Sequence, residues 1–187
     1  MSGTVRLATR CLAAVGPGLE PSGMDAVVDA TGQDRSSRAA ALVEQLRQVS
    51  EALISLVGTI EPERWMNVPK PGVWSPGKEA EHVADGAAYH QWIVRLSLGQ
   101  KVPARPHIER AQLTAQLSQP DVVDLLRQRT QESVMLIAGL SDQQLDLPVR
   151  PPRARSATLA QMIESVLIGH YEVHRADIEA KLRVPIG

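Results

Sequence analysis

Four stretches of this 187-residue chain carry apolar residues at intervals of three and four positions, and segments containing proline separate them. At about 3.6 residues per turn, this spacing collects the apolar side chains on one face of an α-helix, where they can be buried together. The pattern therefore predicts four amphipathic helices, over residues 38–59, over residues 76–98, from Ser118 to Gly139, and from Thr158 to about Arg183.

The predicted helix starts carry residues that cap free backbone N–H groups. Ser75 precedes Pro76, and proline at the first helical position lacks only a donor that would be unpaired there. Ser118 and Thr158 each have an acidic or amide residue three positions later, as in a capping box. No segment alternates β-branched and polar residues over enough positions to predict a strand. The expected fold class is all-α, a four-helix bundle.

The three connections between these helices are long. Each spans about a dozen residues or more, whereas neighbouring helices of a bundle are usually joined by about 2 to 8 residues. Residues 60–74 contain three prolines, which interrupt helical hydrogen bonding. Connections of this length suggest crossovers or a rim built around a site.

Length and composition favour one domain over residues 38–187, preceded by a flexible N-terminal extension over residues 1–37. The formal net charge of -1 lacks the basic excess that nucleic-acid binding requires. No run of about 18 apolar residues exists, so no membrane span is expected. Cys11, the single cysteine, excludes an internal disulfide and a multi-cysteine zinc site, and suits a cytoplasmic protein.

The candidate functional residues are histidines. His170 and His174 lie four positions apart on the last predicted helix, so two imidazoles could share a metal ion, although two half-exposed polar residues would show the same spacing. His82 lies among small apolar residues and is expected to face the core, as a metal ligand or as a hydrogen-bonded core histidine. Glu172 lies about 200° around the helix from His170, which disfavours a zinc-protease site.

Two motifs are similar to those of a known family. Trp74 and Ser75 open the second predicted helix, and His82 follows eight positions after the tryptophan. On the last predicted helix Arg175 follows the histidine pair, and the preceding connection contains LSDQQLD. Over about residues 38–183 the chain resembles the DinB-like metal-binding superfamily, in particular its damage-inducible and thiol-dependent S-transferase branch, of the mycothiol or bacillithiol type.

The resemblance implies a metal site and an assembly. His82, His170 and His174 would be the three protein ligands of one divalent metal ion, with water or substrate in the remaining positions. Zinc, nickel, manganese or iron are the candidates, because imidazole ligands do not decide among several such metals. By the same likeness a homodimer is expected, and a bacterial origin is expected as well.

Nearby acids are expected to support the site. The family text after the second histidine is often HRGQ, whereas this chain has HRAD. Asp177, three residues beyond His174, could accept a ring N–H or hydrogen-bond a water on the metal, and it could equally be an ordinary solvated acid. Asp85 and Glu79, three residues to either side of His82, are similar candidates.

The remaining histidines and the aromatic residues have less defined roles. His90 lies about 80° around the helix and about 12 Å along it from His82, too far to bind the same ion. His90 and His107 are therefore expected to be bystanders. Three aromatic residues could line the site or could pack in the core, and these are Trp74, Tyr89 and Trp92.

The expected function is that of an enzyme that uses the metal as a Lewis acid on a small molecule. It would transfer a low-molecular-weight thiol to an electrophile, or hydrolyse its substrate. Cys11 lies in the extension, so the sulfur would arrive with a cosubstrate. One alternative is a non-catalytic helical protein of the stress response that binds a metal or a ligand. Another is a domain in which the three histidines no longer have a function and which acts by associating with a second copy of itself or with another partner.

Overall fold

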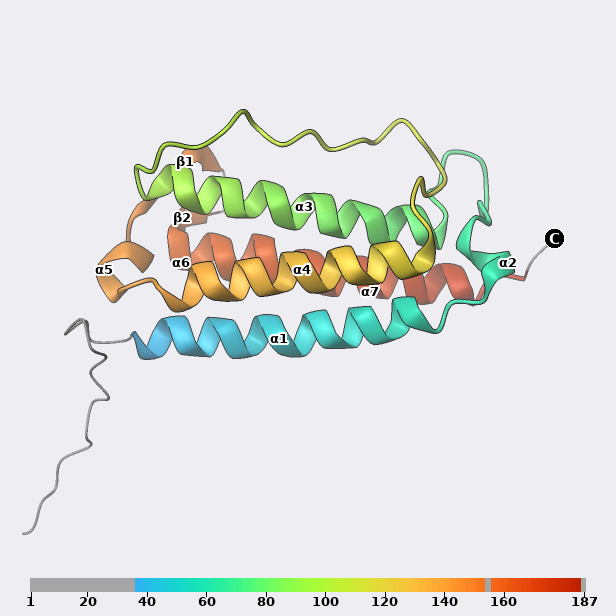
Figure 1. The fold of residues 1–187 in the computed structure, drawn as a ribbon, viewed down its shortest axis with the longest axis horizontal. Coiled ribbons are helices and arrows are strands. Elements are labelled where there is room, and N and C mark those ends of the chain that lie inside the picture. Colours follow the sequence, from blue (N-terminus) through green and yellow to red (C-terminus); the bar gives the residue numbers. More distant parts are fainter. Residues whose placement is uncertain (1–35, 154–155, 186–187) are drawn as a thin grey trace, which may run out of the picture.

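A computed structural model of the protein describes residues 36–153 and 156–185. Four long helical stretches lie side by side in it (Figure 1). They are α1 (Ser37–Gly58), α3 (Pro76–Ser97), α4 (Gln119–Ala138), and a continuous rod of α6 (Leu159–Met162), the π-helix η1 (Ile163–Ile168) and α7 (Gly169–Leu182). The predicted all-α bundle is confirmed, and the helix ends lie close to the predicted ones.

The predicted caps are present at the helix starts. Ser75 Oγ accepts a hydrogen bond from the backbone N–H of Lys78, and Ser118 Oγ accepts one from that of Asp121. Thr158 forms a complete capping box at the start of α6. Each such cap is worth about 1 kcal/mol, so the sequence defines where these helices begin.

The second and third long helices run in the same direction, because the crossover segment, residues 98–118, travels the whole length of the bundle between them (Figure 1). α1 packs against α4 and α7, and α3 packs against the same two helices. The crossover expected from the length of this connection is therefore present. It brings α3 and α7 into contact along one side of the bundle.

The prediction that the chain contains no strand is wrong. β1 (Pro148–Arg153) and β2 (Ser156–Thr158) pair as an antiparallel hairpin between α5 (Asp142–Leu145) and α6. The backbone N–H of Arg150 donates to Ser97 Oγ over 2.9 Å, which ties the hairpin to the end of α3. The prolines of β1 leave it without the alternating pattern of a strand, so contact with α3 rather than local propensity accounts for it.

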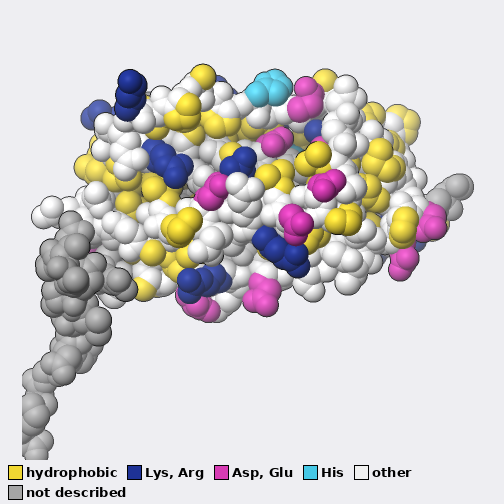
Figure 2. Space-filling model, viewed as in Figure 1, with side chains coloured by type: hydrophobic (Ala, Val, Ile, Leu, Met, Phe, Trp, Pro, Cys, Tyr) yellow, Lys and Arg dark blue, Asp and Glu magenta, His cyan; other side chains and the backbone are white. Residues whose placement is uncertain are grey.

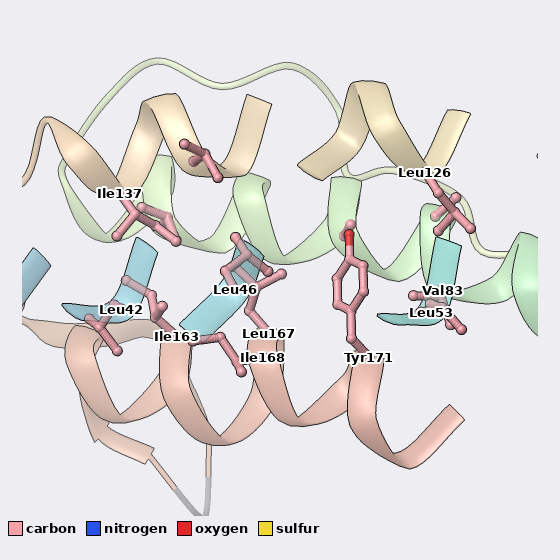
Figure 3. Packing of buried hydrophobic residues seen from close by; sticks show 14 of the residues in the cluster. Leu42, Leu46, Leu53, Val83, Leu126, Ile137, Ile163, Leu167, Ile168 and Tyr171 are labelled. Atoms are coloured by element: carbon pink, nitrogen blue, oxygen red, sulfur yellow. The ribbon is translucent and has the colours of Figure 1, made fainter. Parts of the chain in front are cut away.

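Apolar side chains fill the space between the helices (Figure 3). Leu46 and Leu53 of α1 and Leu126 of α4 are fully buried there, and each such side chain stabilises the fold by about 1.5–3 kcal/mol. Tyr171 of α7 is also fully buried and points toward α4, where its hydroxyl lies 3.3 Å from Thr130 Oγ1. This contact satisfies the one polar atom that the ring carries into the core.

All three tryptophans of the chain bind the crossover segment. Each indole N–H donates a hydrogen bond to a backbone carbonyl of this segment. Trp65, which ends α2 (Pro62–Trp65), donates to Leu117 over 3.3 Å. Trp74 donates to Arg110 over 3.4 Å, and Trp92 donates to Pro103 over 3.0 Å. Trp92 also stacks on Tyr89, with ring planes 12° apart. The segment is thereby held along α3 as the rim that its length suggested.

The face seen in Figure 2 carries basic and acidic side chains interspersed with apolar ones. No extended area of one charge covers that face. This mixture agrees with the nearly balanced formal charge of the chain.

Candidate metal centre

The structure brings together the three histidines that the sequence analysis singled out. His82 of α3 and His170 of α7 face each other, with their Nε2 atoms 3.3 Å apart. His174, one turn further along α7, has its ring centroid 4.3 Å from that of His170 and 5.0 Å from that of His82. One ring nitrogen of each histidine lies within 4.8 Å of the others, so the trio could hold a single metal ion.

The π-helix η1 directly precedes this pair of histidines on the rod. Its i→i+5 hydrogen bonding accommodates an extra residue relative to an α-helix, in which each residue turns by about 100°. η1 therefore changes the direction in which α7 presents His170 and His174 relative to α6. π-helical turns are frequent at functional sites, and no residue pattern in the sequence analysis indicated this one.

A glycine on α3 provides the space for the His170 ring. Gly86 lies one turn beyond His82, and a Cβ atom at position 86 would collide with Cε1 of His170 and lie 3.0 Å from both of its ring nitrogens. The two helices can therefore approach closely enough for their histidines to meet.

We expect Gly86→Ala to weaken metal binding without weakening the fold. The added methyl group would push the His170 ring out of place, whereas alanine is a better helix residue than glycine by about 1 kcal/mol. A dissociation constant for zinc at least about tenfold higher is expected, because misplacing a ligand ring costs at least as much as losing its supporting contact. Competition with a chelating dye measures the affinity, and thermal unfolding of the metal-free protein measures the stability.

Gly169→Ala is the matched control, since its Cβ would meet only the backbone oxygen of Glu164 at an ordinary 3.7 Å. Equal zinc affinity of Gly86→Ala and the parent would show that the ring is not held against this glycine when metal is bound.

Burial sets the ionisation of the cluster. It lowers the pKa of His82 to about 4 and that of His170 to about 2, with the nearby charge of His174 as the next cause. Both imidazoles are consequently neutral at pH 7. A neutral imidazole has a nitrogen lone pair available for a metal, so protons compete little for these two ligands.

Glu79 supports the third histidine. Its carboxylate lies against Nδ1 of His174 and also contacts the Lys181 ammonium group, which lies 102 residues away in the sequence. Burial by itself would raise the pKa of Glu79, but hydrogen bonds from His174 and Lys181 lower it. An ionised carboxylate at Nδ1 leaves Nε2 of His174 free to bind a metal, which is the usual way in which proteins orient a histidine ligand.

The two other acids expected near the site lie differently. Asp177 is exposed, and its Oδ2 is 3.9 Å from Nδ1 of His174. Within the described chain no hydrogen bond or ion pair joins Asp85 to any of the three histidines, and burial raises its pKa. The structure thus brings Glu79 and Asp177 to the cluster and leaves Asp85 outside it.

A sequence profile of the DinB superfamily matches residues 37–178, which form most of the chain. The chain belongs to the DinB superfamily. Searches among curated proteins and among solved structures gave no match. None of the helices in the described DinB-superfamily domain is both long and apolar enough to cross a membrane. The predicted extension over residues 1–37 lies almost entirely outside the described residues and stays a prediction.

Two residues of this DinB-superfamily chain lie closer to the histidine cluster than their positions in the sequence indicated. His90, taken as a bystander because it is far from His82, has its ring 5.2 Å from that of His170, edge to face. Trp74 lies beside the cluster, with its ring 4.8 Å from that of His82. His107 is exposed and pairs with Glu109, as expected of a bystander.

The signal for His90 was present in the sequence. Glu79, His82, Gly86 and His90 recur at intervals of three and four on α3 and so share one face of that helix. What the spacing could not reveal is that His170, from a distant part of the chain, lies between His82 and His90.

The residues of this site fit a divalent metal ion. Within the described chain, the Nδ1 atoms of His82 and His170 are buried without a hydrogen-bond partner. Buried polar atoms are rarely left in that state, so these rings are suited to a further partner such as a metal ion with its waters. Three imidazoles, two of them neutral and the third oriented by a carboxylate, match the donor set of a catalytic metal site.

Proposed function

We propose that this member of the DinB superfamily is a metal-dependent enzyme that transfers a small thiol to an electrophilic small molecule. His82, His170 and His174 would hold one divalent ion. The observation that carries the proposal is the meeting of three imidazoles, two of them buried and neutral, between α3 and α7. We favour zinc or nickel, because these metals accept an all-imidazole donor set more readily than manganese does.

The metal would supply Lewis acidity, which favours the deprotonated form of a thiol or a water molecule at neutral pH. The described part of the chain contains no cysteine, so a thiol nucleophile would come from a cosubstrate. Glu79, which is itself paired with Lys181, holds His174 in one orientation. Trp74 covers His82 with an apolar ring and limits the access of water on that side.

We assign to Asp177 the role of accepting the proton that a thiol loses. Its carboxylate is exposed at the edge of the cluster, 3.9 Å from His174, so it can exchange protons with solvent. In this proposal the protein contributes binding, orientation and a proton acceptor. The thiol sulfur forms its bond to carbon while the leaving group of the electrophile departs with the electrons of its own bond to that carbon, and the thiol proton passes to Asp177.

Zinc-loaded protein is expected to accelerate the reaction of cysteine with 1-chloro-2,4-dinitrobenzene at least about 100-fold over metal-free protein, within the range of general acid–base and Lewis-acid effects. The thioether product is followed by its absorbance. Addition of a chelator should remove the activity, and restoring zinc should return it.

Parallel assays with an activated ester test hydrolysis by the same preparation. One bound zinc per chain with activity in neither assay, over a panel of small thiols and electrophiles, would contradict the proposed enzyme and leave a metal-binding protein without turnover.

A further inference from the structure

The backbone of one cationic residue of the crossover segment, Arg110, is anchored close to the histidine cluster. The indole N–H of Trp74 donates to the backbone oxygen of Arg110 over 3.4 Å, and the N–H of the adjacent Ser75 donates to the backbone oxygen of Leu113 over 2.8 Å. The same Trp74 ring lies 4.8 Å from that of His82. The backbone at Arg110 is therefore held one aromatic ring away from the proposed metal ligands.

The charge of Arg110 acts on the cluster. Besides burial and the charge of His174, the Arg110 guanidinium contributes to the lowered pKa of both His82 and His170. The guanidinium group is therefore close enough to both rings for its charge to act on them. The side chain itself is exposed, so a small molecule in solution can reach it.

Arg110 has no acidic partner among the residues that the structure describes. No ion pair or hydrogen bond joins its guanidinium group to another described residue. Other arginines are engaged: Arg105 of the same segment lies 4.8 Å over the ring of Tyr89, Arg129 pairs with Glu132, and Arg175 pairs with Glu179.

The other charges around the cluster leave it electropositive once a metal is present. Glu79 is an anion balanced by the cation of Lys181, and the three imidazoles bring no negative charge. Asp177 contributes one exposed carboxylate. A divalent ion together with Arg110 outweighs that single negative charge, and such a site attracts an anionic ligand.

We propose that the substrate or cosubstrate of this site carries a carboxylate, which Arg110 binds while the reacting group lies at the histidine cluster. The inference rests on the proposed metal-dependent function and specifies the class of molecule that the site selects. Arginine is suited to this task, because its planar guanidinium group donates two parallel hydrogen bonds to a carboxylate.

Two small thiols of similar size test the inference. Mercaptoacetate carries a carboxylate, and 2-mercaptoethanol has a neutral hydroxyl in its place. Calorimetry on zinc-loaded full-length protein is expected to show at least about tenfold tighter binding of mercaptoacetate, the range of charge-assisted hydrogen bonds. In Arg110→Gln this preference should fall below about threefold while zinc content stays at one equivalent.

Arg105→Gln is the matched control, because it removes a cation from the same segment at a position over Tyr89. It should keep the tenfold preference. An unchanged preference in Arg110→Gln, or binding of neither thiol to the zinc-loaded protein, overturns this inference while leaving the metal site intact. Absence of bound zinc in the parent overturns the proposed function, and the inference falls with it.

Discussion

His170→Ala is expected to abolish stoichiometric metal binding. The parent should contain close to one equivalent of zinc after loading and dialysis, and the variant close to none. Loss of a residue that merely supports a ligand typically costs about 10- to 100-fold in affinity, so removal of one of three ligands should cost more than about 100-fold. Metal analysis of protein purified without an affinity tag measures the content, and His82→Ala should behave in the same way.

Thermal unfolding gives an independent measure of the same loss. Zinc at about 100 times its dissociation constant should stabilise the parent by about 2.7 kcal/mol, and it should leave His170→Ala unchanged. His107→Ala is the matched control, because His107 is an exposed histidine that pairs only with Glu109 among the described residues. Full zinc binding by both His82→Ala and His170→Ala would contradict the assignment of this site.

Glu81→Ala is expected to destabilise the fold by about 3–5 kcal/mol, the cost of leaving a buried charge without its partner. Glu81 and Lys78 form an ion pair at 3.2 Å in which the lysine side chain is only 1% exposed. The same carboxylate accepts the backbone N–H groups of Gln116 and Leu117, so its removal leaves those two donors unpaired as well. Urea unfolding followed by circular dichroism measures the change.

Two further variants define the cause of that loss. Asp124→Ala breaks an exposed ion pair with Arg127 and should cost less than about 1 kcal/mol. The double variant Lys78→Met with Glu81→Gln should be less destabilised than Glu81→Ala, because it leaves no unpaired charge. A loss below about 1 kcal/mol in Glu81→Ala would mean that the crossover segment and Lys78 do not depend on this carboxylate.

Glu81 also links stability to the proposed function. It fixes the end of the crossover segment, and Trp74 fixes the middle of the same segment at Arg110. Partial release of this segment should therefore impair the recognition of a carboxylate before it impairs metal binding, since the histidines belong to α3 and α7.

The spacing of residues along the chain was sufficient to predict the helices and the histidine pair, whereas the full ligand set came from the family resemblance. Helix periodicity and capping depend on neighbours within four positions, so Ser75 and Thr158 could be recognised as helix starts from local sequence alone. The histidine pair of α7 was visible for the same reason. His82 was selected with help from its distance to Trp74, and the family that this motif suggested is confirmed by the DinB superfamily match.

Only the tertiary structure decided how these parts combine. The crossover segment leaves α3 beside α7. The ring of His170, two residues after the end of η1, lies against Gly86. Lys181 contacts Glu79, which is 102 positions away in the sequence. The hairpin of β1 and β2 likewise depends on its contact with the end of α3. These features arise from contacts between segments that are distant in the sequence. Such contacts stabilise the fold without producing a periodic pattern of residues in either segment, so the local sequence does not predict them.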